Sequence, residues 1–559
     1  MNATGPDGLS HYEAPPLHQE EGLGALTLPG FLADIAGRYR DREALCWQDD
    51  AGHTQRWTYG ELLAESRRVA GALLAQGVGR GTRVGVLISN RPEWLFSMFG
   101  AAIAGAVTVS MNTFSTRQEL AYQLQHADVQ LLIMERQVAS KDFVADLVAL
   151  CPPLATDAGP LRVEELPFLR QVVCIDGETG YPGIRSWQSF LEAGETITPA
   201  LLEATAAASS QVDPALIFFS SGSTALPKAI QQSHRAAALQ CWRFGRWFEV
   251  DRDVRTWSAN GFFWSGNFAM AFGCALSVGG CLVLQRYFQP DEALQLFAAE
   301  RVSQILAWPH QEARLLECPG WAQADLSSLI YVDRDSPLAS HPSVNTSWRQ
   351  PNGYGMTETF TFVTGIAGSL NASGLHGFVL PGNTLRIVDP DTGEAVPWGQ
   401  SGEILIKGPT LMQGYLKVPP EDAFDSNGFI HTGDAGSLTP EGELNWTGRL
   451  SDIIKTGGAN VSPAEIDAVL VEHPAIQSVF TVGVPHPTLG ELVVSCVLLY
   501  DDERLEIDEL KAFARQSLAS YKVPREVLFF REDELPMTGS NKIRRPELRK
   551  LAARRLGLD

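Results

Sequence analysis

Short apolar runs alternate with helical patterns over the first two hundred residues, and this alternation most restricts the possible fold. A helical pattern at 31–38 precedes a strand-like run at 43–47, and the sequence from Trp57 opens another helix. Residues 84–89 read as a buried strand, and a helix rich in small residues continues through Gly105. Because such alternation is typical of parallel sheets covered by helices, it predicts an α/β architecture to about residue 210.

The pattern changes toward the C-terminus. From Leu385 onward, short strands separated by glycines predict a small β subdomain. Beyond a boundary at 448–455, roughly a hundred residues carry the helix and strand patterns of a compact α/β unit. We expect an α/β multidomain fold: residues 1–450 form a large N-terminal domain of two α/β subdomains and a small β subdomain, and residues 451–559 form a small α/β C-terminal domain. The first 25 or so residues resemble a loose polar lead-in.

Composition excludes several classes of protein. The net charge of −21 and the pI near 5.0 argue against a nucleic-acid partner. No uninterrupted apolar run of about 18 residues is present, so we expect no membrane span, and the polar N-terminus does not resemble a signal peptide. The eight cysteines include no C-x-x-C pair and are expected to be reduced, buried thiols. These features predict a cytoplasmic protein.

One loop carries the residue types that bind phosphate. An apolar run ending at Phe219 leads into Ser220, Ser221, Gly222, Ser223 and Thr224, and a Pro-Lys pair ending at Lys228 follows. Hydroxyls, backbone N–H groups and one ammonium group can together surround a polyphosphate. The spacing is not that of a Walker A loop. A Ser/Thr-rich surface turn would explain this segment if it stood alone.

Four further segments accompany the loop. Three adjacent aromatic residues stand between small residues at 260–267, and an aromatic, a hydroxyl and a carboxylate share the loop at 352–358. An aspartate closes the segment 431–434, and the basic C-terminal tail includes the segment 540–544. Each motif by itself is a weak signal, but their common order along the chain is a strong one.

Taken together, these motifs resemble the adenylate-forming superfamily of acyl-CoA synthetases, peptide-synthetase adenylation domains and luciferases, over nearly the whole chain. The segment 90–94, Gly105 and Asn112 also resemble the acyl-CoA synthetase branch. Members of this superfamily join a carboxylate to the α-phosphate of ATP with release of pyrophosphate, and a thiol then displaces AMP. The resemblance implies an AMP-forming acid–thiol ligase that uses ATP, Mg²⁺ and coenzyme A.

The resemblance also implies roles for individual residues. Ser220 to Thr224 and Lys228 would hold the β- and γ-phosphates, and Asn352, Gly353 and Tyr354 would bind the nucleotide, with Tyr354 stacked on adenine. Thr357 would contact the α-phosphate and Glu358 would hold Mg²⁺. Asp434 would accept hydrogen bonds from both ribose hydroxyls, with Arg449 beside it.

The remaining implied roles lie near the C-terminal domain. Lys542 matches the lysine that bridges the acyl carboxylate and the α-phosphate, whereas without its motif it would be read as a solvated surface lysine. Ser451 occupies the hinge position, where Asp or Lys is usual, and the C-terminal domain would rotate about it between the two half-reactions. Gly457 and Gly458 would line the pantetheine tunnel, where the absence of a Cβ allows close passage. Lys455 completes the expected cofactor-binding set.

The acid-binding residues are more specific to this chain. Amino-acid-activating members usually place an aspartate in the aromatic motif, where this chain has Phe262, Phe263 and Trp264, so an α-amino acid is disfavoured. With Asn267 and Trp308, these residues suggest a pocket for a bulky apolar carboxylate, whether aromatic, alicyclic or terpenoid. A fatty acid also remains open, and so does simple core packing of the aromatic residues.

Three features depart from the family pattern. Alanines stand at 225 and 229 where glycines are usual, and an added methyl group could bar a positive φ or crowd phosphate. The usual Gly-Gly-Ala-Pro-Leu turn appears as residues 334–338, with Asp335 where it could repel phosphate. The third is the hinge, Ser451.

These departures have two interpretations. The first is sequence drift within the family, with full activity retained. The other is impaired adenylation, with the enzyme mainly converting a preformed acyl-adenylate to the thioester in secondary metabolism, and Ala225→Gly with Ala229→Gly should then raise pyrophosphate exchange.

Other functions were weighed against a CoA ligase. A stand-alone adenylation enzyme would load a separate carrier protein, and a luciferase-like oxygenase would depend on oxygen. A catalytically inactive binding protein is disfavoured because Glu358, Asp434 and Lys542 are all present, and a serine hydrolase because no G-x-S-x-G occurs. The expected partners are therefore a small carboxylic acid and CoA, with a separate adenylating enzyme or a carrier protein and a homodimer as further options.

Overall fold

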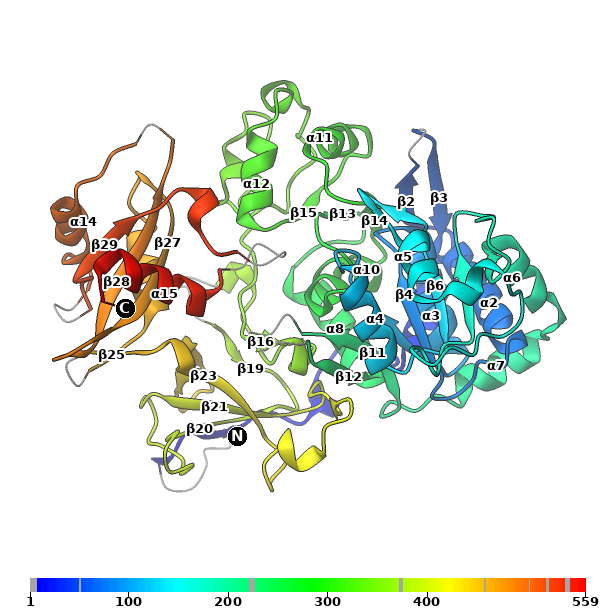
Figure 1. Ribbon diagram of the computed structural model, residues 1–559, viewed down its shortest axis with the longest axis horizontal. Coiled ribbons are helices and arrows are strands. Elements are labelled where there is room, and N and C mark those ends of the chain that lie inside the picture. The colour runs from blue at the N-terminus through cyan, green and yellow to red at the C-terminus, as the bar shows by residue number, and fades with distance from the viewer. Residues whose placement is uncertain are drawn as a thin grey trace. The chain divides into compact units, whose positions relative to one another are not determined.

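The structure is a computed structural model that describes residues 8–49, 52–220, 227–370, 376–456, 459–501, 503–518, 522–537 and 543–558 (Figure 1). The chain divides into two compact units. The larger unit comprises Ala14–Asn383 and Lys407–Gly428, and the smaller unit comprises Met1–Glu13, Thr384–Ile406 and Phe429–Asp559. The expected domain boundary at residue 450 stays a prediction.

An eight-stranded sheet lies in the first part of the larger unit. Its spatial order is β10-β9-β6-β4-β5-β11-β12-β22. Strands β10 through β11 run parallel, whereas β12 is antiparallel to β11 and β22 is antiparallel to β12. In that order the strands span Ile184–Ser186, Gln171–Cys174, Leu131–Met134, Arg83–Leu87, Val107–Ser110, Pro214–Phe219, Ala229–Ser233 and Gly414–Tyr415.

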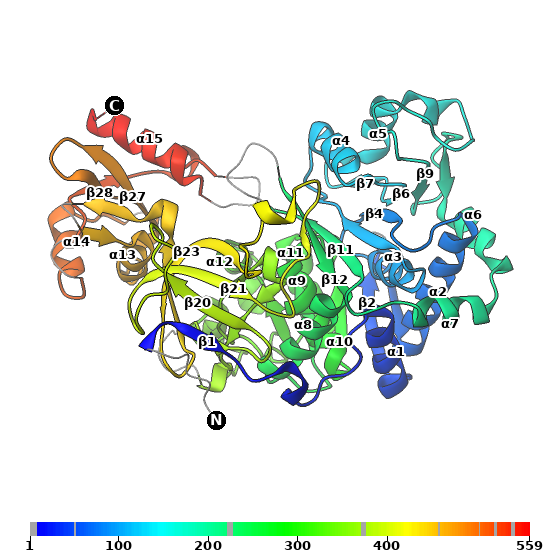
Figure 2. The same cartoon turned by 90° about the horizontal axis from the view of Figure 1, so that it is seen from below.

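Helices cover both faces of this sheet, as Figure 2 shows for α4 and α5 on one side of β4 and β6 and for α1, α2 and α3 on the other. Within β6, Ile133 packs into the core beneath α2 and α3, whereas Leu132 packs into the core beneath α4 and α5. Both faces of the strand are apolar because both are buried. The helices of this region are α1 Leu28–Tyr39, α2 Tyr59–Ala75, α3 Pro92–Ile103, α4 Arg117–His126, α5 Phe143–Leu150, α6 Trp187–Ala193 and α7 Pro199–Ala207.

A second, five-stranded sheet completes the α/β part of the larger unit. Its order is β15-β13-β14-β2-β3, parallel except for β3. These strands span Gln304–Leu306, Arg255–Ser258, Cys281–Leu284, Glu43–Gln48 and Thr54–Thr58. The helices of this part are α8 His234–Trp247, α9 Ser265–Asn267, α10 Cys274–Val278, α11 Pro290–Ala299 and α12 Pro309–Leu316. Three two-stranded ribbons pair β7 Gln137–Val138 with β8 Lys141–Asp142, β16 Gly355–Met356 with β17 Thr361–Phe362, and β18 Thr364–Gly365 with β19 Phe378–Val379.

The smaller unit contains two sheets. The first has the order β1-β20-β21-β23-β24 and corresponds to the predicted β subdomain. Its strands span His11–Glu13, Thr384–Val388, Gly402–Lys407, Ile430–Leu438 and Leu444–Arg449. The second sheet has the order β26-β25-β28-β27, with β29 beside β28, and its strands span Ala459–Val461, Ile454–Thr456, Gly490–Leu499, Ile476–His486 and Glu526–Phe529.

Three helices accompany the second sheet, namely α13 Pro463–Leu470, α14 Ile507–Ala514 and α15 Arg545–Leu556. Val493 packs with residues of α13 and α14, whereas its neighbour Val494 packs with residues of α15. The alternation of a strand therefore places helices on both faces of this sheet. The predicted α/β fold, with a small C-terminal α/β domain, is confirmed.

The N-terminal segment is not a loose lead-in, so that expectation was wrong. Residues 11–13 form β1 and pair with β20. In the larger unit, Glu20 binds the guanidinium of Arg243, which has an exposed fraction of 0%, through contacts of 2.8 to 3.1 Å. A buried arginine needs such a partner, and the polar sequence alone gave no sign that this glutamate supplies it.

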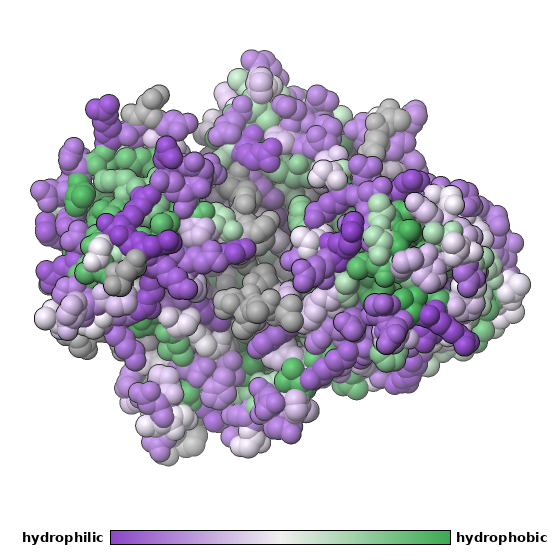
Figure 3. All heavy atoms as spheres, in the orientation of Figure 1, coloured by the Kyte–Doolittle hydropathy of each residue, from purple (hydrophilic) through white to green (hydrophobic). Residues whose placement is uncertain are grey.

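Hydrophilic residues cover most of the face drawn in Figure 3, with smaller apolar patches between them. Within the described part of the chain, no helix is long and apolar enough to cross a membrane. All eight cysteines are buried and unpaired, as expected.

Candidate active site

The predicted phosphate loop joins β11 to β12. Residues 221–226, which include the predicted Ser221, Gly222, Ser223 and Thr224, lie outside the described residues, but both ends of the loop are described. The Ser220 amide donates to the Lys228 carbonyl (2.9 Å), and the Lys228 amide donates to the Ser220 hydroxyl (3.1 Å). The Tyr122 hydroxyl also donates to the Pro227 carbonyl (2.9 Å). These bonds close the base of the loop.

Tyr415 connects two of the predicted site residues. The Lys228 ammonium group lies 4.6 Å from the centroid of its ring, and its hydroxyl donates to Glu358 Oε1 at 2.9 Å. The cation–π contact and the hydrogen bond hold the predicted phosphate-binding cation and the predicted metal ligand to one rigid side chain. Sequence reasoning missed Tyr415 because it lies on β22, far along the chain from both partners.

The segment 352–354 is held by close backbone contacts. The Asn352 side chain accepts from the Gly353 amide (2.9 Å), and the Tyr354 amide donates to Thr364 Oγ1 (3.0 Å). A Cβ on Gly353 would lie 2.4 Å from the Thr364 carbonyl oxygen, so only glycine fits at this position. Tyr354 is buried, with an exposed fraction of 7%.

Thr357 and Glu358 follow in a short helical turn. Gln232 Nε2 donates to the Thr357 carbonyl, and the Met412 amide donates to the Glu358 carbonyl, both at 2.7 Å. Just beyond them, Phe360 and Thr361 have positive φ values of 48° and 89°. For a β-branched residue this conformation is strained, and it persists because surrounding contacts determine the loop. The backbone that carries the two predicted catalytic side chains is therefore tightly constrained.

The donor chemistry of Glu358 suits a magnesium ion. One carboxylate oxygen accepts from Tyr415. The other has no hydrogen-bond partner within the part of the chain that the structure describes. A half-buried carboxylate oxygen is the hard ligand that Mg²⁺ prefers.

A network of amides fixes the aromatic segment 260–267. The Asn260 carbonyl accepts from the Asn90 side chain (2.8 Å) and from the Asn267 side chain (2.6 Å). Asn90 Oδ1 accepts in turn from the Phe262 amide (3.1 Å), and Ser258 Oγ donates to Asn267 Oδ1 (2.6 Å). Asn267 is thus committed to backbone and hydroxyl partners, which suits a group that positions the segment 260–267. Asn90 gave a sequence signal through its motif, whereas Ser258 gave none.

The predicted aromatic residues occupy different environments. Phe262 is buried in the core against Trp94, with ring centroids 5.2 Å apart. Phe263 lies edge-on to Trp264 (5.7 Å) and to Phe114 (5.9 Å), a residue that sequence reasoning missed. Phe114 and Trp308 are unusually exposed for large aromatic residues, at 58% and 46%. The structure therefore joins Phe114, Phe263 and Trp264 into one aromatic group, and no ring contact among the described residues adds Trp308 to it.

In the smaller unit, Asp434 and Arg449 face each other across β23 and β24. Arg449 Nε lies 3.0 Å from Asp434 Oδ1, and Arg449 Nη1 donates to the Thr432 carbonyl (2.8 Å). The Asp434 side chain is buried at 5% exposure, whereas Arg449 is half exposed. A buried carboxylate paired with one cation remains a strong acceptor for hydroxyl donors.

The residues around the predicted hinge are partly described. Ser451 is exposed in a single helical turn, Leu450–Asp452, and its hydroxyl contacts the Asp452 carboxylate at 3.2 Å. The Lys455 amide donates to Glu491 Oε2 (2.8 Å), and its side chain is exposed. The predicted Gly457, Gly458 and Lys542 lie outside the described residues.

Two of the departures from the family pattern have a structural explanation. Ala229 is fully buried in β12 and has no positive φ, so its backbone does not require glycine and its methyl group fills the core. The carboxylate of Asp335 lies 3.4 Å from Arg349 and 3.8 Å from Arg334. These two guanidinium groups counter the negative charge that was expected to repel phosphate. Ala225 lies outside the described residues.

One cluster elsewhere has the ligand types of a metal site. Glu43, Cys46 and Glu300 place potential ligand atoms within 4.8 Å of one another. However, Arg56 and Arg255 each pair with both carboxylates at 2.8 to 3.0 Å. Burial also raises the pKa of Cys46 to about 12, which keeps the thiol protonated. The cluster is therefore a partly buried ion-pair network.

Comparison with known proteins agrees with this geometry. The family model described as AMP-binding enzyme matches residues 32–416, and the model described as AMP-binding enzyme C-terminal domain matches residues 465–542. The chain is 30% identical to acyl-CoA ligase SID4 of Ajellomyces capsulatus, over 96% of this chain and 92% of that protein. It is 29% identical to 4-coumarate–CoA ligase 1 of Arabidopsis thaliana, over 89% and 88%. The crystal structure of the anthranilate CoA ligase AuaEII with anthranoyl-AMP has a TM-score of 0.78 at 24% identity, covering 95% of this chain and 98% of that one.

The chain therefore belongs to the AMP-binding enzyme family, within the acyl-CoA ligase branch of the adenylate-forming superfamily. It is an AMP-forming acid–thiol ligase that works through an acyl-AMP, and it uses ATP with Mg²⁺ and coenzyme A.

Proposed function

We propose that this ligase forms the CoA thioester of a bulky hydrophobic carboxylic acid, with an aryl, alicyclic or terpenoid skeleton. The observation that carries the proposal is the aromatic group of Phe114, Phe263 and Trp264, the last two of which lie in the segment that the amide network fixes. Rigid aromatic surfaces favour large apolar ligands. The segment 260–267 contains no acidic residue to pair with an ammonium group.

The relatives add limited support. One of them, from Arabidopsis thaliana, is named 4-coumarate–CoA ligase 1, which points to an aromatic acid. Another is named a medium-chain acyl-CoA ligase, from Danio rerio, at the same 29% identity. Overall similarity therefore does not distinguish an aromatic acid from a medium-chain acid as the substrate. The side chains around Phe263 are the stronger guide to the substrate.

In the first half-reaction, an acid carboxylate oxygen attacks the α-phosphorus of ATP and the bond to pyrophosphate breaks. We assign Ser220 and Lys228 to the β- and γ-phosphates, and Thr357 to the α-phosphate. Lys542 would hold the attacking carboxylate against the α-phosphate and offset their mutual repulsion. Glu358, oriented by Tyr415, would hold Mg²⁺, which supplies charge neutralisation for the departing pyrophosphate.

The other assignments concern the nucleoside and the thiol. Tyr354 would stack on adenine, and Asp434 would accept the ribose hydroxyls with its orientation fixed by Arg449. In the second half-reaction the CoA sulfur attacks the acyl carbonyl carbon, and AMP leaves with the bonding electron pair. Gly457 and Gly458 are assigned to the pantetheine path, and Ser451 to the pivot between the two half-reactions.

Two observations favour the complete reaction over a ligase that uses only a preformed acyl-adenylate. Ala229 occupies ordinary strand conformation, and Asp335 is paired with two arginines. Neither position therefore gives a physical reason for slow adenylation.

The proposal is tested by mass spectrometry of the products formed from enzyme, Mg·ATP, CoA and a panel of bulky and straight-chain carboxylic acids. Parallel reactions replace acid and ATP with synthetic acyl-adenylates, and a further set replaces CoA with a phosphopantetheinyl carrier protein. We expect acyl-CoA by both routes and preference for a bulky acid. Preference for straight-chain acids would contradict the pocket assignment, and thioester from the adenylates alone would contradict the complete reaction.

A Lys542→Ala variant separates the half-reactions. We expect it to lose pyrophosphate exchange by a factor of about a hundred or more, in line with the loss of a charged transition-state contact, while retaining thioester formation from the acyl-adenylate. Equal loss of both half-reactions would contradict the role assigned to Lys542.

A further inference from the structure

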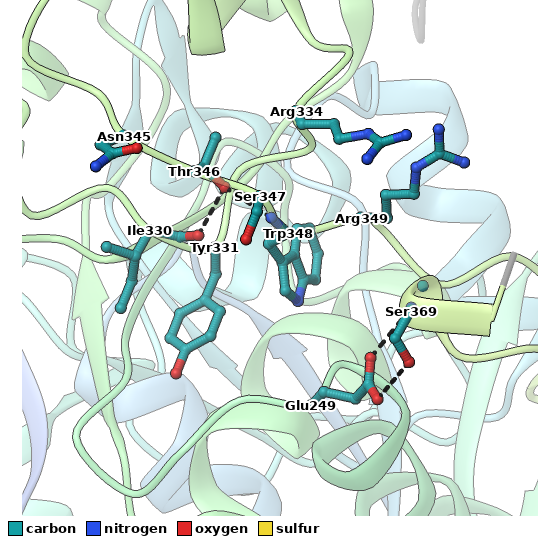
Figure 4. Close-up of a pocket in the computed structure, with 11 residues that line it drawn as sticks. Glu249, Ile330, Tyr331, Arg334, Asn345, Thr346, Ser347, Trp348, Arg349 and Ser369 are labelled. Carbon is teal, nitrogen blue, oxygen red and sulfur yellow. Dashed lines mark hydrogen bonds between the residues drawn. The ribbon is translucent and has the colours of Figure 1, made fainter. Parts of the chain in front are cut away.

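A second cavity, of about 640 Å³, lies in the larger unit (Figure 4). Four pieces of chain form it: Glu249 after α8, the segment 330–334, the segment 345–349 and a short turn at 368–369. None of the residues assigned above to acid, nucleotide or CoA lines it. Its volume is in the range of sites that hold a small organic molecule.

A rigid aromatic surface lies at the centre of the cavity. The Trp348 indole Nε1 donates to the Phe248 carbonyl (2.8 Å), and the Trp348 amide donates to Thr346 Oγ1 (3.1 Å). The Thr346 hydroxyl in turn contacts the carbonyl of Ile330 at 2.9 Å. Because these bonds fix the indole before any ligand arrives, a flat ring could bind against it at low cost in conformational entropy.

Positive charge gathers at one edge of this surface. The Arg334 and Arg349 side chains lie beside each other above Trp348 in Figure 4. Asp335 is within 4 Å of both guanidinium groups, but its side chain is 70% exposed, and the three groups together carry one net positive charge. In a chain with a net charge of −21, a local excess of arginine is a specific feature. Paired guanidinium groups favour carboxylate, sulfonate or phosphate oxygens.

The opposite edge offers an acceptor. The Glu249 carboxylate accepts from the Ser369 hydroxyl (2.7 Å) and from the Ser369 amide (3.2 Å). These bonds fix the direction of the carboxylate, as the dashed lines in Figure 4 show. The cavity thus has an anion-binding edge, a flat apolar middle and an acceptor edge.

We infer that this cavity is a second ligand site, and that it binds a small molecule with a flat ring and one anionic group. The ring lies on Trp348, and the anionic group contacts Arg334 and Arg349. An aromatic acid and a nucleoside monophosphate share this chemistry. The inference concerns the cavity alone and does not depend on which acid the ligase activates.

The test is isothermal titration calorimetry of the full chain with naphthalene-1-sulfonate, which cannot be adenylated, and with the neutral isostere naphthalene-1-sulfonamide. The variants are Arg334→Gln with Arg349→Gln, and separately Trp348→Leu. We expect the double variant to bind the sulfonate at least tenfold more weakly than the wild type does. The wild type should bind the sulfonamide more weakly than the sulfonate by a similar factor. A parallel titration with AMP distinguishes a nucleotide from an aromatic acid as the better ligand.

Arg67→Gln is the matched control, because Arg67 has nearly the same side-chain exposure as Arg334, 46% against 48%, and an ion pair of 3.9 Å against 3.8 Å. It should leave binding unchanged. Hydrogen exchange locates the ligand: peptides covering 330–349 should gain protection with the sulfonate in wild type and not in the double variant. Unchanged affinity in the double variant, or protection confined to 260–267, would overturn the inference.

Discussion

Tyr415 lies between Lys228 and Glu358, with its ring 4.6 Å from the ammonium group and its hydroxyl 2.9 Å from the carboxylate. Lys228 follows the predicted phosphate loop, and Glu358 follows the segment 352–354, which is predicted to bind the nucleotide. Tyr415 comes from β22. Oppositely charged groups are therefore held apart and oriented by one side chain, instead of neutralising each other directly. That arrangement suits the roles proposed for the two groups, in which Lys228 binds phosphate and Glu358 holds Mg²⁺.

Replacing Tyr415 should impair the first half-reaction. Tyr415→Phe keeps the ring beneath Lys228 and removes the hydrogen bond to Glu358, so we expect pyrophosphate exchange to fall about tenfold, because a hydrogen bond to a charged group is worth roughly 1.5–3 kcal/mol. Tyr415→Leu removes both contacts, so its rate of pyrophosphate exchange should fall further. Tyr500→Phe, at an exposed tyrosine, is the control. Full activity in Tyr415→Phe would show that the hydroxyl does not position Glu358.

Ala229 should stabilise the fold without limiting catalysis. Ala229→Gly removes a fully buried methyl group from a strand and should lower the free energy of unfolding by about 1–2 kcal/mol. Pyrophosphate exchange should not rise. Ala139→Gly is an informative contrast, because Ala139 has a φ of 51° and glycine there should be neutral or stabilising. Faster pyrophosphate exchange in Ala229→Gly, measured at equal folded fraction, would contradict this prediction and indicate that the methyl group slows adenylation.

Phe114 should influence the choice of acid. Because this side chain is 58% exposed, Phe114→Ala should change the free energy of unfolding by less than about 1 kcal/mol. Loss of its contact with Phe263 should raise the KM for the preferred bulky acid several-fold and leave the KM for ATP unchanged. Phe168→Ala, at a phenylalanine that is 46% exposed elsewhere, is the control. The measurement is steady-state kinetics of both variants. An equal change in the KM for the acid in Phe114→Ala and Phe168→Ala would contradict a place for Phe114 in the acid pocket.

His234 should make the larger unit sensitive to acid. Burial lowers the pKa of His234 to about 4, from the ordinary value near 6.5, and its Nδ1 accepts from the Leu28 amide at 3.3 Å. Between these two values the unfolded chain binds a proton that the folded chain does not, so stability is complete above pH 6.5 and falls as the pH drops toward 4. The contribution is about 3 kcal/mol.

The measurement is chemical denaturation between pH 4.5 and 7.5. His234→Asn keeps an acceptor for the Leu28 amide and cannot titrate, so the slope of stability against pH should become shallower. An unchanged slope would mean that other groups account for acid sensitivity.

Arg545 should stabilise the C-terminal region. Its guanidinium contacts Asp467 at 3.0 Å, Asp452 at 3.5 Å and the Thr481 carbonyl at 2.5 Å. Arg545→Gln leaves the buried Asp467 without its cation. We therefore expect the free energy of unfolding of this region to fall by about 3 kcal/mol. Burial already raises the pKa of Asp467 to about 6. Adding Asp467→Asn should therefore recover part of the loss in denaturation experiments, and no recovery would contradict the ion-pair explanation.

The sequence determined the fold class and the chemistry of this protein. Short apolar runs and helical patterns of period 3.6 are local properties, so the strands 43–47 and 84–89 and the helix at 31–38 were predictable to within a few residues. The motif at 352–358 and Asp434 indicated adenylate chemistry only through the resemblance that they and the other motifs together show to the adenylate-forming superfamily.

Only the tertiary structure decided how those residues are supported. Pairing of β22 with β12 brings Tyr415 to Lys228, and a carbonyl of the aromatic segment gathers Asn90 and Asn267. The tertiary structure also placed Glu20 on Arg243, against the expectation of a loose N-terminal segment, and it gave Ala229 an ordinary strand conformation, a point that the sequence left open. Such contacts join residues that are distant along the chain, and no local pattern encodes them, because their free energy arises only when packing removes the groups from water.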